Sequence, residues 1–90
     1  MSNGNHYPTI NMQQTGNNIK QLIKGNNLTV AEVAHFMGFA EPQAVYKWLR
    51  GASLPTVDNL YALSKLLNTT MEDILVGDDG VSFPFICTIT

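Results

Sequence analysis

The sequence predicts an all-α domain of five short helices, with a flexible N-terminal arm before it and a β-prone tail after it. Two observations predict the helices: apolar residues recur every three or four positions, and Thr stands before several helix starts while Gly or Asn follows the ends. The final ten residues alternate with the period of a strand instead. We therefore divide the chain into an arm (1–14), a domain (15–76) and a tail (77–90).

Composition favours one small folded domain without metal or disulfide support. The chain has 90 residues, of which 44% are hydrophobic, as in ordinary globular domains. Its single cysteine, Cys87, cannot form an internal disulfide, which fits a reducing cytosol. There is no N-terminal signal pattern, and no apolar run approaches the roughly 18 residues of a membrane span. We expect a cytoplasmic protein without a cofactor.

Charge is unevenly distributed along the chain. The net charge is −2, which is low for a nucleic-acid-binding protein. Residues 15–51 carry four Lys or Arg and two Glu, whereas residues 52–90 carry one Lys and five Asp or Glu. A weakly basic face backed by an acidic one would orient a DNA duplex without binding it tightly, which favours a dimer.

The first segments are a polar arm and a short helix. The arm holds mostly Asn, Gln, Ser and Gly, and its His6 has no neighbouring ligand residue, so a solvated side chain is favoured over a metal ligand. Thr15 is expected to cap a helix over residues 17–24, and Gly25 is expected to end it in a left-handed conformation. The apolar side of this helix is Ile19, Leu22 and Ile23.

A capping box predicts the second helix. Thr29 and Glu32 have the spacing at which side chain and backbone cap each other, which opens a helix to about residue 37. Gly38 ends it. His35 falls on the outer side, where a surface histidine is favoured over a phosphate contact. The inward positions are Val30, Val33, Ala34 and Met37.

The third helix, residues 42–49, has one apolar and one polar side. Pro42 suits the first turn, and Val45, Trp48 and Leu49 have the spacing of a buried stripe. We expect Trp48 to anchor the core rather than to stack on a base. Phe39, in the preceding turn, should point inward. The solvent side carries Gln43, Tyr46, Lys47 and Arg50, and Gly51 ends the helix.

Two more helices and a tail complete the chain. Thr56 caps a helix over residues 57–67, and Thr70 caps a short one over residues 71–75. A turn or hinge is expected at residues 77–80. The run at 81–90 alternates like a strand, but Pro84 limits it to an edge. It could pair with the arm, with its counterpart in a dimer, or with nothing.

The chain resembles the Cro/C1-type (XRE-like) helix-turn-helix regulators of phages and bacteria. The matching pieces, within residues 15–76, are TVAEVAHFMGF, AVYKWLRG, SLPTVDNLYALSKLL and TMEDILV. The resemblance implies a five-helix, lambda-repressor-like DNA-binding domain that reads the major groove with its third helix. Two departures stand out: the interval from Gly38 to Val45 is one residue longer than the commonest turn, and Pro42 replaces a frequent base-reading residue.

Carried onto this sequence, the resemblance assigns six DNA-binding residues. Gln43 would contact adenine, Lys47 a guanine or a phosphate, and Ala44 a thymine methyl group. Three more would hold phosphates, which position the protein without reading the sequence. They are Tyr46, Arg50 and Thr29.

The predicted function is sequence-specific DNA binding as a transcriptional repressor, by a homodimer on duplex DNA. The alternative is a protein-interaction module, such as an antitoxin or prophage regulator, which the net acidity and the apolar tail favour. An enzyme is not expected, because Cys87 and the two His lack a nucleophile–base spacing and no phosphate-binding loop is present. With no separate ligand domain, no small-molecule ligand is expected.

Overall fold

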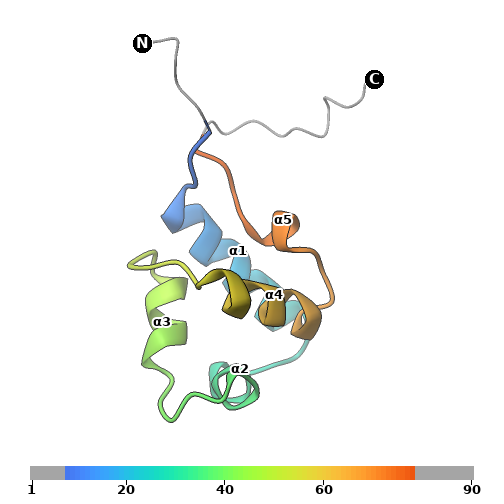
Figure 1. Cartoon of the computed structure of the whole chain (residues 1–90). Coiled ribbons are helices and arrows are strands. Elements are labelled where there is room, and N and C mark those ends of the chain that lie inside the picture. The colour runs from blue at the N-terminus through green and yellow to red at the C-terminus, as the bar shows by residue number, and fades with distance from the viewer. Residues whose placement is uncertain (1–7, 79–90) are drawn as a thin grey trace.

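All five predicted helices are present in the computed structural model of the chain, which describes residues 8–78. Figure 1 shows them in order. The interpretations of His6, Cys87 and the run 81–90 lie outside the described residues. Within the described part, no helix has the length and apolarity needed to cross a membrane, and no three His, Cys, Asp or Glu gather as they would around a metal. The helices are α1 (Met12–Gly25), α2 (Val30–Met37), α3 (Gln43–Leu49), α4 (Val57–Leu66) and α5 (Met71–Ile74).

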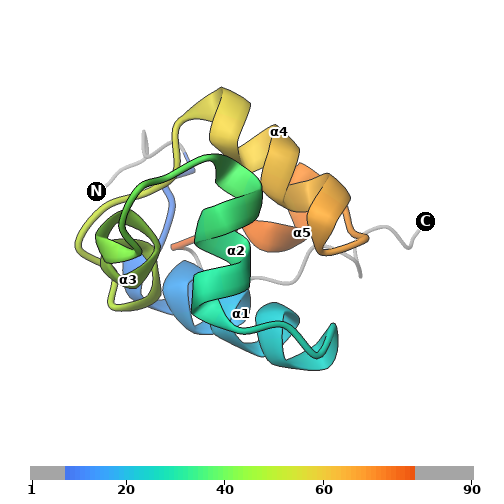
Figure 2. The same ribbon diagram turned by 90° about the horizontal axis from the view of Figure 1, so that it is seen from below.

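The five helices enclose one apolar core. Seen from below, α2 crosses the molecule between α1 and α4, and α3 lies at one end beside α1 and α2 (Figure 2). Burying these side chains is the main source of stability for so small a domain. The buried apolar residues are Ile19, Ile23, Val33, Ala34, Val45, Trp48, Leu60, Leu63, Leu67 and Ile74.

The start of α1 differs from the prediction. Asn11, not Thr15, is the N-cap, and its side-chain oxygen accepts a hydrogen bond of 2.9 Å from the Gln14 amide. Thr15 lies fully buried inside α1, where its Oγ1 accepts a hydrogen bond of 2.9 Å from the amide of Val76. Both residue types are good caps, so tertiary contacts decided between them. The helix consequently includes residues that we had assigned to the arm.

The contacts that select Asn11 form a terminal clasp, in which residues 9–11 pair with residues 76–78. The Asn11 amide donates to the Val76 carbonyl at 2.8 Å, and the Asp78 amide donates to the Thr9 carbonyl at 2.7 Å. Ile10 and Gly77 form an isolated antiparallel bridge between these bonds. Gly77, expected in a turn, is therefore held extended against the arm, and the clasp joins both ends of the described chain.

The end of α1 also needs a correction. Gly25 is the last residue of the helix, and the left-handed conformation falls on Asn27, with φ of 59°. The preceding Asn26 closes the helix by donating from its side-chain amide to the Leu22 carbonyl at 2.8 Å and to Leu67 at 3.1 Å. Since Asn tolerates positive φ better than most residues, no glycine is required there.

Candidate nucleic-acid interface

Helix α2 is capped by its own residues, as predicted. The Glu32 amide donates to Thr29 Oγ1 at 3.1 Å, and the Thr29 amide donates to Glu32 Oε1 at 2.8 Å. These two bonds satisfy amides that have no partner within the helix. Gly38 ends the helix, as predicted, and adopts a left-handed conformation with φ of 80°.

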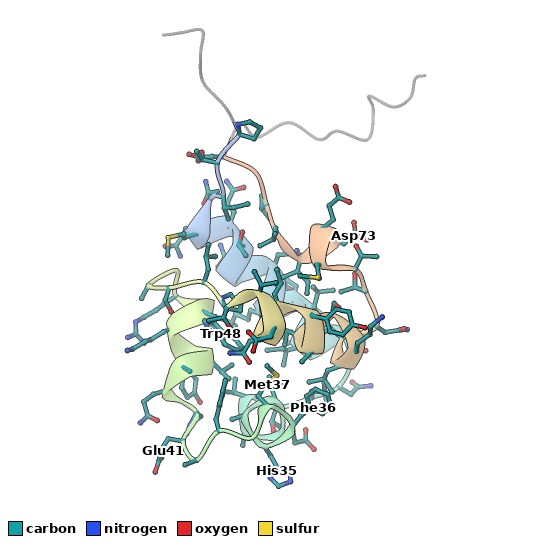
Figure 3. All side chains as sticks on the ribbon, viewed as in Figure 1. His35, Phe36, Met37, Glu41, Trp48 and Asp73 are labelled. Carbon is teal, nitrogen blue, oxygen red and sulfur yellow. The ribbon has the colours of Figure 1, made fainter. Side chains whose placement is uncertain are left out.

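The turn between α2 and α3 is fixed by aromatic packing. The Phe39 amide donates to the Ala34 carbonyl at 2.9 Å. Its half-buried ring meets Trp48 edge-on, with ring centroids 5.8 Å apart and planes at 69°. In Figure 3, Trp48 points into the core while His35 and Glu41 point away from it near the turn. This packing sets the direction in which α3 leaves the turn.

Helix α3 presents a polar face because its apolar side is buried. Val45 is fully buried, Trp48 is 4% exposed and Leu49 packs against the core. The helix begins at Gln43, one residue later than predicted: Pro42 is its N-cap, and no side chain caps this helix. Exposed on the other side are Gln43, Tyr46, Lys47 and Arg50, with Ala44 half-buried. The predicted division of α3 into a core side and a solvent side is confirmed.

The C-terminal end of α3 lies directly against α1 at Gly16. A Cβ atom on Gly16 would lie 2.6 Å from the Leu49 carbonyl oxygen and would also collide with the Trp48 carbonyl oxygen. Only a residue without a side chain fits between these two backbones. This role could not be predicted from the sequence, because nothing local distinguishes Gly16 from any other glycine in a helix.

A hollow of about 490 Å³, which we call the α1–α3 groove, lies between α1, the start of α2 and α3. Three cationic side chains line it: Lys20 and Lys24 from α1, and Arg50 from the end of α3. Sequence reasoning did not select the two lysines as binding residues. Their spacing of one helical turn was the available signal, but their closeness to Arg50 depends on how α1 and α3 pack.

The six predicted DNA-binding residues fall into three places. Gln43 and Lys47 lie one turn apart on the exposed side of α3, next to the half-buried Ala44. Tyr46 and Arg50, also one turn apart, line the α1–α3 groove. Thr29 stands apart at the start of α2, where its hydroxyl group and amide are bonded to Glu32.

The sequence and the fold both match helix-turn-helix proteins. Residues 19–74 match the family model described as "Helix-turn-helix". The chain is 30% identical over 64 residues to the HTH-type transcriptional activator BcrR of Enterococcus faecalis. That alignment covers 71% of this chain but only 31% of BcrR, so this chain spans about a third of the length of that relative.

Three solved structures share the fold. The restriction-modification controller protein C.AhdI of Aeromonas hydrophila has a TM-score of 0.63 at 17% identity, covering 70% of this chain and 94% of its own. SinR, a master regulator of biofilm formation solved with DNA, has 0.60 at 23%, covering 67% and 95%. Hydroxypropylphosphonic acid epoxidase from S. wedmorenis has 0.64 at 22%, covering 79% and 40%. At these identities the likeness shows the fold alone.

Proposed function

This chain belongs to the Cro/C1-type helix-turn-helix family, and we propose that it binds duplex DNA and regulates transcription. The observation that carries the proposal is the two-sided α3, which buries Val45 and Trp48 while it exposes Gln43 and Lys47. A helix supported from behind in this way can enter the major groove as a rigid unit.

Base reading is assigned to the exposed side of α3. The Gln43 amide can pair with adenine N6 and N7, and the Lys47 ammonium group with guanine O6 and N7. Ala44 would contact a thymine methyl group. Since Pro42 offers no hydrogen-bond donor, the reading surface is narrow, and one copy would specify only a few base pairs.

Phosphate contacts are assigned to the flank of α3 that faces α1. Tyr46 and Arg50 lie there beside Lys20 and Lys24, so four donors share one side of the molecule. Phosphate contacts of this kind set affinity and position, not sequence preference. Thr29 has the weakest support of the six, because the Glu32 carboxylate holds its amide and hydroxyl group and would repel a phosphate.

We propose a cytoplasmic homodimer that acts as a repressor by occupying a promoter. Two copies on a pseudo-palindrome would double a short reading surface, with half-sites about 34 Å apart. The enterococcal relative BcrR is named as a transcriptional activator. Activation would require an additional contact with the transcription machinery.

Selection of bound duplexes from a random pool tests this function. The wild-type protein should enrich one motif, and Gln43→Ala/Lys47→Ala should lose sequence preference at those positions while melting at the same temperature. Each lost base contact should reduce discrimination by about 1–3 kcal/mol. Unchanged selectivity in the double variant would refute the assignment of α3.

A matched control exists on other helices. Gln14→Ala/Lys65→Ala removes the same two side-chain types from exposed positions on α1 and α4. It should leave the enriched motif intact. If it impairs selectivity as strongly as Gln43→Ala/Lys47→Ala, the effect is one of overall charge and not of base reading.

The second candidate function is a protein-interaction module, which the net charge of −2 favours. Salt separates the two functions: a DNA complex with several phosphate contacts should weaken steeply as salt rises, with a logarithmic slope of about −0.9 per contact. An apolar protein interface should be insensitive to salt. Catalysis is not proposed, because the likeness to the epoxidase extends over only 40% of that enzyme.

A further inference from the structure

We propose that the α1–α3 groove binds a small organic anion with an apolar body, such as an aromatic carboxylate or sulfonate, and that this ligand excludes DNA. The exclusion rests on the proposed function, whereas the binding does not. From the sequence we expected no small-molecule ligand, since no local pattern of residues marks a groove that exists only where three helices meet.

The floor of the groove is apolar. Leu28, Val30 and Leu49 line it and are only partly buried, and Ile23 closes it from the core side. At about 490 Å³ the hollow falls within the range of small-molecule sites, which is about 300–1,000 Å³. A DNA backbone would meet the cations at the rim and leave this apolar surface unfilled. A ligand with a ring or a branched chain would cover it.

The cations define the charge of the ligand. Lys20, Lys24 and Arg50 surround the floor, and the residues described as lining it include no carboxylate. Arg50 has the planar donor geometry that suits a carboxylate or sulfonate group. Tyr46, whose side chain is 49% exposed, adds an aromatic wall beside it. An apolar body with one anionic group therefore matches both parts of the groove.

The location makes the ligand a competitor of DNA. Tyr46 and Arg50 line the groove and are also assigned to phosphate contacts. One side chain cannot serve both partners at once, so occupancy of the groove should raise the apparent Kd for DNA by a factor of one plus the ratio of ligand concentration to ligand Kd.

The probe is 8-anilinonaphthalene-1-sulfonate, titrated into the full chain in the absence of DNA. Its fluorescence should rise to saturation at one molecule per chain. Lys20→Gln/Lys24→Gln should weaken its binding about tenfold by removing charge-assisted contacts. N-phenyl-1-naphthylamine, which lacks the sulfonate, should bind the wild type and this variant equally. Lys65→Gln, on α4, is the control for net charge and should change neither titration.

A floor variant tests the apolar part. Val30→Thr keeps the shape of the side chain but places a hydroxyl group in the groove, and it should weaken both probes about threefold. Circular dichroism melting of each variant checks that the fold is kept. Non-saturating fluorescence, or binding unchanged in Lys20→Gln/Lys24→Gln, would overturn the site. Weaker DNA binding in that variant with unchanged probe binding would assign the lysines to phosphates alone and would also overturn it.

Competition between the sulfonate probe and duplex DNA tests the exclusion of DNA. Increasing the sulfonate probe should release a duplex enriched from the random pool, in proportion to groove occupancy. Saturable probe binding without displacement would overturn the exclusion of DNA. If the probe binds and no duplex is ever enriched, the binding site is supported while the exclusion and the proposed function both fail.

Discussion

Helices α2 and α3, the helix-turn-helix pair, are held in place by different means. Local residues define both ends of helix α2: a Thr29–Glu32 capping box begins it and the left-handed Gly38 ends it. Helix α3 is also followed, as predicted, by a glycine, the left-handed Gly51, but no side chain caps the start of this helix. It depends on packing against α1 and α2 through Val45, Trp48 and the backbone contact at Gly16. The helix proposed to read DNA is therefore the one whose start has no local support.

This difference has a functional consequence. A seven-residue helix is far too short to be stable alone, so α3 is helical only while it is docked. Changes in the core should displace or unfold α3 and abolish DNA binding, whereas changes at the α2 cap should loosen one turn only. Substitutions in the core, at the contact between α1 and α3, and at the helix caps should therefore differ in their effects on stability and DNA binding.

Trp48→Ala should cost about 3–5 kcal/mol of the free energy of unfolding, because it removes the buried anchor of α3 and its edge contact with Phe39. Urea unfolding measures the loss, and amide exchange shows whether α3 opens before α2. Trp48→Phe is the control and should retain part of the stability. Equal loss of protection in α2 and α3 would contradict their separate modes of support.

Gly16→Ala should destabilise the domain by about 1–3 kcal/mol and impair DNA binding, because the new methyl group would force α1 and the end of α3 apart. Thermal unfolding and duplex binding measure the two effects.

The control for this change lies in the same helix. Gly25 has open space where its Cβ would be, so Gly25→Ala should stabilise the protein by about 0.5–1 kcal/mol. Destabilisation by both substitutions would show that α1 rejects any added methyl group, and the contact at Gly16 would not be the cause.

Thr29→Ala should cost about 1 kcal/mol, because it removes the side-chain acceptor for the Glu32 amide. Faster amide exchange should be confined to the first turn of α2, with α3 unchanged. Glu32→Gln, which keeps an acceptor for the Thr29 amide, should cost less. Loss of α3 protection in Thr29→Ala would mean that the two helices are not independently supported.

We expect the smallest effect on stability at Asp58, at the start of α4. It tests a local cap outside the helix-turn-helix pair. A 2.8 Å hydrogen bond from the Thr56 hydroxyl group, with smaller backbone contributions, lowers the pKa of Asp58 below its usual 3.8. Since the folded pKa is the lower one, its stabilisation is present above pH 3.8 and is lost as the pH falls through the folded value.

Melting temperatures of wild type and Asp58→Asn measure this contribution. The variant should melt below the wild type at pH 7, and the difference should shrink near pH 3. A constant difference between the two pH values would show that the carboxylate charge contributes nothing.

Local signals predicted most of the fold. The caps at Thr29, Thr56 and Thr70 are where the sequence placed them, because each is followed at once by residues that bond to it. The prediction failed at α1, where Asn11 and Thr15 are both competent caps. It failed again at Gly25 and Asn27, where two residues could adopt the turn conformation. Distant partners, Val76 for Thr15 and Leu67 for Asn26, settled these choices.

The candidate site likewise contains features that the sequence predicted and features that it did not. The exposure of Gln43 and Lys47 was predicted because helical spacing alone places them opposite Val45 and Trp48, and the family resemblance then assigned both residues to DNA. The grouping of Lys20 and Lys24 with Arg50 was not predicted, since it joins residues 26 or more positions apart. Whether the six assigned residues contact DNA stays a prediction for the selection experiment.

The number of helices, most of their ends and the polar face of α3 thus follow from the sequence, because hydrogen bonds and spacing within one helix depend on neighbours in the chain. The cap of α1, the terminal clasp, the need for glycine at position 16 and the α1–α3 groove follow from packing. Each of these depends on the distance between segments that packing brings together, and no local pattern of residues encodes that distance.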